Sequence, residues 1–503
     1  MSKLIVGVIG YRKQSYKIIS NLIKNKSIKK IYSFCYRKEK VNSLNKNNKV
    51  KKIQYVSDLK KLDKCKSIFI SSSTETHFKY IKQFIKKNIH IYCEKPGPTN
   101  LKQINFLKKL PKKINYFMVI PTLRCDLKCT YCQVSRVDKN LKGYDWDEKI
   151  LNKFFNFVEN YGSQNIKIEF QGGEPTLRTD IISKIIIWTE KKKINAEFVI
   201  CTNLMNISKE LEEVIQKENV FISTSIDGTR EIQSKQRTED DEMSDKFFNN
   251  FDYIVKKYGR NKISALPTFS DFNNVKTTID KYRELGLKVI FLRAVNYQGF
   301  ARKLFPESKD QVNKWLKVYF ESIKYIFKKN FETNDNLIEF NLQTNLKRIF
   351  QPGHNGHLDL RNPNFAARDN FVIDYNGKIY PSDESRMISR IGIIDLSIGN
   401  VLSGIDEKKI NEFNWNQISD TNPDCIHCSH QAFCGVDSVD DLSRYNRIDI
   451  PKKETTFCQN QIAKFDDIFL KLISNDPSNV YNFTGHLNGI FTLNPPYGNI
   501  IYD

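Results

Sequence analysis

The stretch Cys125-Asp-Leu-Lys-Cys129-Thr-Tyr-Cys132 follows the apolar run 114–120 and places three cysteines within eight residues. A C-x3-C-x2-C spacing lets three thiolates hold three irons of a four-iron, four-sulfur cluster, which leaves the fourth iron open to a substrate or cofactor. The alternatives are a structural zinc site and three unrelated core thiols. A structural zinc ion takes four ligands, and no fourth candidate lies nearby in the sequence. The spacing therefore favours a [4Fe–4S] cluster on these three cysteines.

Tyr131, the aromatic residue before the third cysteine, makes this motif resemble that of radical S-adenosylmethionine (SAM) enzymes. The resemblance implies that SAM binds at the open iron and is cleaved to a carbon radical. A second motif, Gly172-Gly173-Glu174-Pro175, matches the family's loop at the methionyl amino group of SAM. Alone, this tetrapeptide is only a turn signal. In the family its glycines let the backbone come close, and Glu174 either accepts from an ammonium group or braces the loop.

Residues 113–300 alternate strand-like runs with amphipathic helices and predict a partial (β/α)6 barrel, the form that radical SAM enzymes share. Parallel barrels gather their chemistry at the carboxyl ends of the strands. Thr202 and Asn203 follow the third strand, and Ser225 and Asp227 end the fourth. By resemblance these residues lie near SAM or the substrate; for Ser225 and Asp227 an ordinary strand-end turn is an equal alternative. The predicted strands are 114–120, 166–170, 196–201, 220–225, 262–267 and 287–293, and the predicted helices are 148–161, 180–192, 208–218, 245–258 and 275–286.

Residues 1–112 follow a parallel, doubly wound pattern of strands and helices. The predicted strands are 3–9, 30–36, 67–71 and 89–93, and the predicted helices are 15–24 and 76–87. The segment resembles the nucleotide-binding Rossmann half of the glucose–fructose oxidoreductase/inositol dehydrogenase (Gfo/Idh/MocA) family. The residues that carry this resemblance are Gly7-Val-Ile-Gly10, Ser72-Ser-Thr-Glu-Thr-His77 and Cys93-Glu94-Lys95-Pro96. In that family the lysine of the last motif lies at the nicotinamide.

Two departures weaken this nucleotide site. A dinucleotide-binding turn reads G-x-G-x-x-G, whereas Arg12 and Ser15 stand at its second and third glycine positions. Arg37-Lys38 end the second strand where an acid would bind the ribose of NAD, and this suits the 2′-phosphate of NADP. The family's C-terminal substrate domain is absent, because the cysteine motif begins a different domain. We therefore expect a docking or nucleotide-sensing module that binds NADP(H) weakly or not at all.

A second cysteine group lies in the C-terminal third, with the spacing C-x2-C-x5-C-x23-C over Cys425, Cys428, Cys434 and Cys458. It follows predicted helices at 309–329 and 335–350 and a hairpin at 371–380 with an Asn-Gly turn. The group resembles the SPASM domain of peptide-modifying radical SAM enzymes, which commonly carries two auxiliary clusters. Because Ser382 and Ser438 stand where cysteines of the other site would be, we expect one auxiliary [4Fe–4S] cluster. The alternative is a structural zinc ribbon, with His427 or His430 as possible ligands.

The cysteine motif, His354-Asn-Gly-His357, residues 379–387 and Cys434-Gly-Val-Asp437 together resemble the B-type maturase of the His-Xaa-Ser peptide system. The resemblance covers residues 114–470 and implies hydrogen abstraction from a ribosomally made peptide, with an electron donor such as flavodoxin or ferredoxin. Asp383 is the candidate base, since related sulfatase-maturing enzymes place a catalytic Asp after the cysteine that Ser382 replaces. The alternative for Asp383 is a capping aspartate. Two other classes stay open: a radical SAM enzyme acting on a sugar or other small molecule, and a non-catalytic protein with a structural metal.

The 503-residue chain has a net charge of +23, and residues 1–113 hold 29 Lys and Arg against 5 Asp and Glu. No aromatic-interleaved basic motif accompanies this charge, so a solvated surface is favoured over nucleic-acid binding. No apolar run can span a bilayer and no secretory signal is evident, so we expect a cytoplasmic location with reduced thiols and no membrane partner. Cys35, Cys65, Cys93 and Cys201 are expected to fill cores. The expected domains are 1–112, 113–300, 301–369 (helical connector), 370–470 (auxiliary-cluster domain) and 471–503 (C-terminal tail).

Overall fold

The computed structural model contains two compact units, Met1–Pro111 and Lys112–Asp503, each with hydrophobic cores of its own. Three stretches named above, Arg12, Glu94-Lys95-Pro96 and His354-Asn-Gly-His357, lie outside the described residues. The structure describes residues 4–10, 13–85, 87, 89–93, 103, 114–299, 301–304, 309–350, 366–419, 422–474 and 476–487.

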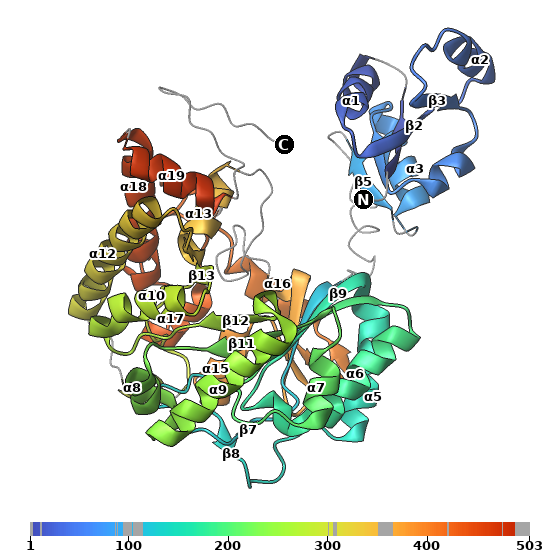
Figure 1. Ribbon diagram of the computed structural model, residues 1–503. Coiled ribbons are helices and arrows are strands. Elements are labelled where there is room, and N and C mark those ends of the chain that lie inside the picture. The colour runs from blue at the N-terminus through green and yellow to red at the C-terminus, as the bar shows by residue number, and fades with distance from the viewer. Residues whose placement is uncertain are drawn as a thin grey trace. The chain divides into compact units, whose positions relative to one another are not determined.

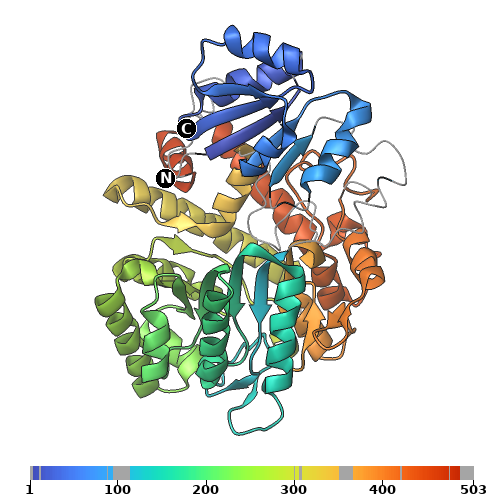
Figure 2. The ribbon, with the colours of Figure 1, turned by 90° about the vertical axis from the view of Figure 1, so that its right-hand side faces the viewer.

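The N-terminal unit is a five-stranded parallel sheet in the order β3-β2-β1-β4-β5 (Figure 1). Figure 2 shows these blue strands side by side, flanked by helices. The order reverses between β1 and β4, which confirms the doubly wound prediction. The strands are β1 (Leu4–Ile9), β2 (Ile28–Phe34), β3 (Ile53–Val56), β4 (Ser67–Ile70) and β5 (His90–Cys93), and the helices are α1 (Lys13–Lys24), α2 (Lys38–Lys46) and α3 (Thr74–Phe84).

Two small cores cover the two faces of this sheet. Ile19 of α1 and Val41 of α2 pack on one face around Cys35, and Phe84 of α3 packs on the other around Cys65. Both cysteines are buried, as expected of core thiols. The sequence prediction missed α2 and β3, because the strand Ile53–Val56 is only four residues long and lies among lysines and asparagines that show no apolar period.

The second unit is built on a nine-stranded sheet in the order β12-β11-β10-β9-β6-β15-β16-β17-β18. Neighbours from β12 to β15 are parallel and those from β15 to β18 are antiparallel. The helices α5, α6, α7 and α9 connect the parallel strands, α10 follows β12, and all five bury apolar residues in the core of this unit (Figure 1). The parallel strands are β6 (Ile114–Val119), β9 (Gly162–Phe170), β10 (Asn195–Cys201), β11 (Val220–Ser225), β12 (Ile263–Leu266) and β15 (Asn370–Ile373), and the helices are α5 (Glu148–Tyr161), α6 (Thr179–Lys191), α7 (Lys209–Ile215), α9 (Asp241–Tyr258) and α10 (Val275–Glu284).

The sixth predicted strand, 287–293, differs from the prediction. Only β13 (Val289–Ile290) is extended, and it pairs with β14 (Ile338–Glu339) rather than with β12. A single parallel bridge between Phe269 and Ala294 links this edge to the segment after β12. The run loses its strand character because Leu292 N donates to the buried Glu339 side chain at 3.1 Å instead of to a sheet neighbour.

The predicted hairpin at 371–380 is present as β15 and β16 (Lys378–Tyr380). Its first strand also pairs with β6, so strands that are far apart in the sequence share one sheet. The short strands β17 (Gly399–Asn400) and β18 (Gly404–Ile405) extend the same sheet. In the segment expected as a tail, α19 packs Phe483 into the main core. The remaining α-helices are α8 (Arg230–Gln233), α11 (Ala301–Leu304), α12 (Lys309–Thr333), α13 (Phe340–Phe350), α14 (Ala366–Asp369), α15 (Asp383–Arg390), α16 (Glu407–Trp415), α17 (Ser438–Tyr445), α18 (Thr456–Ile473) and α19 (Pro477–His486).

Candidate functional site

The three cysteines of the first motif lie in the loop after β6, at the carboxyl edge of the parallel strands. Two short strands, β7 (Arg124–Cys125) and β8 (Val137–Asp138), hold the loop, and Figure 1 shows them together at one end of the barrel. Burial raises the pKa of Cys125 and of Cys129. A pocket lies beside Cys125, lined also by Asp126, Leu127, Lys128, Asp138, Lys139, Thr238, Glu239 and Met243.

The Gly172-Gly173 pair packs directly on the backbone of the cysteine loop. Gly172 has φ +137°, and a Cβ on Gly173 would lie 2.2 Å from the carbonyl oxygen of Arg124. Gly173 N donates to Thr122 O at 3.1 Å and Glu174 N donates to Arg124 O at 2.7 Å. Only glycine fits this close approach. The glycines therefore fix the position of the cysteine loop, a role that the sequence pattern did not specify.

Glu174 is buried, and both of its carboxylate oxygens accept hydrogen bonds from the chain. Oε2 accepts from Asn203 N at 2.7 Å, and Oε1 accepts from Thr176 N at 3.1 Å and from Thr176 Oγ1 at 2.7 Å. Asn203 Nδ2 in turn donates to Asp126 Oδ1 at 2.6 Å. The carboxylate thus ties the loops after β9 and β10 to each other, as the bracing role considered for Glu174 requires.

Two other residues predicted for the SAM loops stabilise these turns. Pro175 is the first residue of the 3-10 turn Pro175–Arg178, where its missing N–H costs nothing. The buried Thr202 hydroxyl accepts from Leu204 N at 3.1 Å, which shapes the turn after β10.

A second brace joins Tyr131 to the end of β11. The Tyr131 hydroxyl donates to Asp227 Oδ2 at 2.5 Å and accepts from Arg237 NH1 at 2.7 Å. Asp227 is buried, which raises its pKa, and its Oδ1 accepts from Thr268 N at 2.9 Å. Asp227 therefore orients the aromatic residue of the cysteine motif, whereas Ser225 is half-buried at the strand end.

Arg237 was not predicted from the sequence as a site residue. It lies in the π-helical turn Ser234–Thr238, and the carbonyl of its neighbour Gln236 accepts from Thr130 N at 3.0 Å. No motif marks this turn, so only the fold brings it to the cysteine loop.

Cys201 corrects the expectation of a core thiol. Its Sγ donates to Glu169 Oε1 at 3.5 Å, and the same carboxylate accepts from Gln171 Nε2 at 2.6 Å and from Tyr116 OH at 2.7 Å. Lys167 adds an ion pair to Glu169 at 3.3 Å. These side chains come from β6, β9 and β10 and alternate along the strands with residues that face the helices. Cys201 therefore belongs to a polar network inside the barrel.

The four cysteines of the second group line one small cavity. They come from three segments: the turn with Cys425 and Cys428, the stretch at Cys434, and the first turn of α18 with Cys458. Burial raises the pKa of Cys434 to about 12 and of Cys458 to about 11. Four soft sulfur donors around a shared space fit an iron–sulfur core.

The two histidines considered as zinc ligands lie differently. His427 is exposed, whereas His430 is buried, lines the same cavity and contacts Asp466 through Nε2 at 2.8 Å. In the described part of the chain, no three His, Cys, Asp or Glu side chains lie close enough together to hold a single metal ion.

Asp383 is the first residue of α15 and forms a buried ion pair. Its Oδ1 accepts from Arg386 Nε at 2.7 Å, and Arg386 also faces Asp374 at 3.8 Å. The helix is capped by Ser382, whose side chain accepts from Ser385 N at 3.1 Å. The capping alternative for Asp383 is therefore wrong. Ser438, the other residue at a lost cysteine position, is buried and donates to Asn416 O.

In the N-terminal unit, two serine hydroxyl groups lie at the turn that corresponds to the dinucleotide-binding turn. Ser15 Oγ and Ser71 Oγ are 2.7 Å apart and buried, and a Cβ on Gly10 would lie 2.3 Å from Ser15 Oγ. Ser15 thus fills the space of the third glycine and bonds to Ser71, the residue after β4. Arg37 and Lys38 are exposed at the end of β2.

Two family models match the chain. Residues 119–303 match the radical SAM superfamily, and residues 4–119 match the oxidoreductase family with an NAD-binding Rossmann fold (GFO_IDH_MocA). The match to the radical SAM superfamily implies a [4Fe–4S] cluster and SAM. No helix among the residues that the structure describes is both long and apolar enough to cross a membrane.

Relatives of known activity match parts of the chain. A cysteine-type anaerobic sulfatase-maturating enzyme of Clostridium novyi is 25% identical over 305 residues, which are 54% of this chain and 74% of that protein. A GTP 3′,8-cyclase of Clostridium botulinum is 29% identical over 199 residues, 38% of this chain and 51% of that protein. The solved structure of anSMEcpe with bound AdoMet has the same fold, with a TM-score of 0.56 and 18% identity over 75% of this chain and 98% of that one. This chain therefore contains a radical SAM domain and, before it in the sequence, a Rossmann domain of the Gfo/Idh/MocA type, and it is similar to sulfatase-maturating enzymes.

Proposed function

We propose that this enzyme modifies a ribosomally made peptide by hydrogen abstraction. The observation that carries the proposal is the convergence of Cys425, Cys428, Cys434 and Cys458 on one cavity, in addition to the cysteine loop of the barrel. A second cysteine site of this kind is what the SPASM resemblance implies for peptide-modifying enzymes. The sulfatase-maturating relative supports the same class of substrate.

In this proposal Cys125, Cys129 and Cys132 hold the [4Fe–4S] cluster that binds SAM. When loaded, the cluster and SAM supply a 5′-deoxyadenosyl radical that abstracts a hydrogen atom from the substrate. Glu174 and Asn203 keep the loops around SAM in register, and Asp227 with Arg237 holds Tyr131 and thereby the cysteine loop. These contacts preorganise the site before SAM binds.

The four C-terminal cysteines would hold one auxiliary [4Fe–4S] cluster, which would supply an electron acceptor. Flavodoxin or ferredoxin is the proposed electron donor to the enzyme. A peptide chain is the proposed substrate because anSMEcpe, which shares the fold, has been solved with AdoMet and a peptide.

Asp383 is the proposed base that removes a proton as the substrate radical is oxidised. In this proposal its pairing with Arg386 fixes the carboxylate at the start of α15. We expect Asp383→Asn to form 5′-deoxyadenosine but little modified peptide, measured by mass spectrometry. Full peptide turnover in this variant would remove Asp383 from the mechanism.

A radical reaction on a small molecule is the second candidate function. It is favoured by the GTP 3′,8-cyclase relative, whose similarity covers 38% of this chain. In that case the N-terminal unit would present a nucleotide or substrate. We propose instead that this unit binds NADP(H) weakly or not at all, since Ser15 fills the third glycine position of its turn. Calorimetry that gave sub-micromolar NADP binding would overturn this part of the proposal.

The deciding experiment measures iron, sulfide and zinc per chain after anaerobic reconstitution. We expect about eight irons in the wild-type protein and about four in the variant with Cys125, Cys129 and Cys132 changed to Ala, with no SAM cleavage in the latter. Cys93→Ala, a cysteine of the N-terminal unit, is the matched control and should keep all the iron. About four irons with one zinc in the wild-type protein would make the C-terminal site structural and contradict the proposal.

A further inference from the structure

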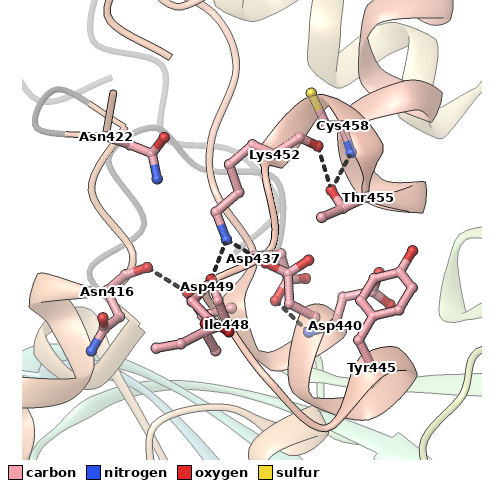
Figure 3. Close-up of polar contacts among 12 residues, drawn as sticks. Asn416, Asn422, Asp437, Asp440, Tyr445, Ile448, Asp449, Lys452, Thr455 and Cys458 are labelled. Carbon is pink, nitrogen blue, oxygen red and sulfur yellow. Dashed lines mark hydrogen bonds and ion pairs between the residues drawn. The ribbon is translucent and has the colours of Figure 1, made fainter. Parts of the chain in front are cut away.

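A buried ion pair forms part of the wall of the C-terminal cysteine cavity. Lys452 and Asp441 both line the cavity, and they are 8% and 1% exposed. Lys452 Nζ lies 2.5 Å from Asp441 Oδ2 and donates to Ile448 O at 3.1 Å. Figure 3 shows the lysine side chain reaching down from the segment that precedes Cys458.

The backbone of Lys452 is tied to both cysteine segments. Its N–H donates to Asp424 Oδ2 at 2.6 Å, next to Cys425. Its carbonyl accepts from Thr455 Oγ1 at 2.8 Å, and the same hydroxyl accepts from Cys458 N at 3.3 Å (Figure 3). The lysine is therefore held at a fixed place between the two parts of the cavity.

Burying this ion pair in the lining of the cavity costs desolvation free energy. Desolvation of two charges offsets most of their attraction, and an apolar pair of similar volume stabilises a core as well or better. In addition, Asp441 Oδ1 is buried and has no hydrogen-bond partner among the described residues. Stability alone therefore does not account for the pair.

Lys452 and Asp441 line the same cavity as the four cysteine thiols, so their charges lie in the wall around those thiols. Burial raises the pKa of Cys425, and the Lys452 ammonium acts against that rise. Burial likewise raises the pKa of Cys458, and Asp441 is among the carboxylates that add to the rise. A buried cation acts on a nearby charge more strongly than an exposed cation does, because water and salt screen it less.

We infer that Lys452, held in place by Asp441, sets the reduction potential of the auxiliary cluster. The inference rests on the proposed function, because it requires a [4Fe–4S] cluster on the four cysteines. Such a cluster carries net negative charge that increases on reduction, and net charge and surroundings set its potential. A fixed cation in the wall stabilises the reduced form and raises the potential. Lys452 is thus a positioning residue that acts on the cluster through its charge.

The test is a redox titration of the auxiliary cluster, followed by electron paramagnetic resonance. The full chain with Cys125, Cys129 and Cys132 changed to Ala isolates the auxiliary signal. In this background we expect Lys452→Met to shift the midpoint to lower potential and Asp441→Asn to shift it to higher potential. Lys452→Arg keeps the charge and should stay near the parent value. Lys453→Met removes an exposed neighbouring charge and is the matched control, with a shift several times smaller than that of Lys452→Met.

The outcomes separate this inference from the proposed function. An unmoved potential in a Lys452→Met protein that keeps its cluster overturns the inference alone. If Lys452→Met does not retain iron, Asp441→Asn decides, since it keeps the lysine; an unmoved potential there also overturns the inference. A background protein without a four-iron cluster refutes the proposed auxiliary cluster, and the inference with it.

Discussion

The two cysteine sites differ in how the chain satisfies the polar groups around them. At the barrel loop, Glu174 and Asp227 are buried, and each accepts hydrogen bonds on both carboxylate oxygens. Around the C-terminal cavity, Asp441 Oδ1 and His430 Nδ1 are buried without a hydrogen-bond partner among the described residues. The chain therefore satisfies these two carboxylates of the first site by itself. The second leaves polar atoms facing a space lined by thiols, where a bound group would complete it.

The largest expected effect comes from Arg386, whose NH1 and NH2 also have no hydrogen-bond partner in the described part of the chain. Arg386→Met should lower the free energy of unfolding by about 3–5 kcal/mol, because it leaves Asp383 and Asp374 buried without their cation. Urea unfolding measures this loss. Arg390→Met, on the same helix but half-buried, should cost much less. Equal losses of unfolding free energy in the two variants would show that Arg386 is not a critical charge. They would also weaken the comparison between the two cysteine sites.

The brace at the first site predicts a large catalytic effect. Glu174→Ala leaves Asn203 N and the two Thr176 donors without their acceptor and releases the loop after β10. A misplacement of about 1 Å lowers rates roughly 100-fold, so we expect 5′-deoxyadenosine formation to fall by about that factor.

The auxiliary iron should be retained in this variant, and iron content together with chromatography of 5′-deoxyadenosine checks both points. Glu197→Ala, an exposed glutamate on β10, is the control. Loss of iron from both sites would contradict the separate organisation of the two environments.

His486 is a buried polar group of the C-terminal region, and both of its ring nitrogens have hydrogen-bond partners. Its Nε2 accepts from Glu339 N at 2.9 Å and its Nδ1 contacts Asn482 O at 2.7 Å, and burial lowers its pKa to about 4. The unfolded chain takes up the proton first as the pH falls. The free energy of unfolding should therefore decrease from pH 6.5 downward, by about 1–2 kcal/mol at pH 5, until the folded histidine is protonated near pH 4.

Urea unfolding of the wild-type protein and of His486→Gln over this pH range measures the difference. The variant should lose this part of the pH dependence. Parallel curves for the two proteins would show that His486 is not the group responsible.

The smallest expected effect is that of the Tyr131 hydroxyl. Tyr131→Phe removes the group that bridges Asp227 and Arg237 and should cost about 1 kcal/mol, with a modest decrease in SAM cleavage. Thermal unfolding and 5′-deoxyadenosine formation measure the two effects. Tyr253→Phe makes the same chemical change at an exposed site and should alter neither. A loss of cleavage as large as that of Glu174→Ala would show that the second brace is as important as the first.

The sequence predicted the elements that have a clear apolar period. The helix 148–161 agrees with α5 residue for residue, because Asp147 caps it and its apolar residues recur on one face. Short elements without such a period were missed, as for β3. The sixth strand was overpredicted, because an apolar run does not show which neighbour its backbone will bond to.

The contiguous motifs could be recognised from sequence, but their physical roles could not. Glu174 was found from the Gly-Gly-Glu-Pro stretch, yet its partners Thr176 and Asn203 follow only from the fold. Arg237 and the Lys452–Asp441 pair lie in no motif, since long-range packing alone brings them to the cysteines. The assignment of Asp383 as a base stays a prediction.

The pairing of β15 with β6 has a consequence for the order of folding. The two strands lie side by side, yet Tyr116 and its partner Asn370 are separated by most of the second unit. At a synthesis rate of about 5–20 residues per second, β6 leaves the ribosome roughly 10–50 s before β15 exists. During that interval one edge of β6, the strand that leads into the cysteine loop, has unpaired backbone groups open to other chains. The sheet beneath the SAM site is therefore completed late in synthesis, and a chain truncated before residue 370 would retain that open edge.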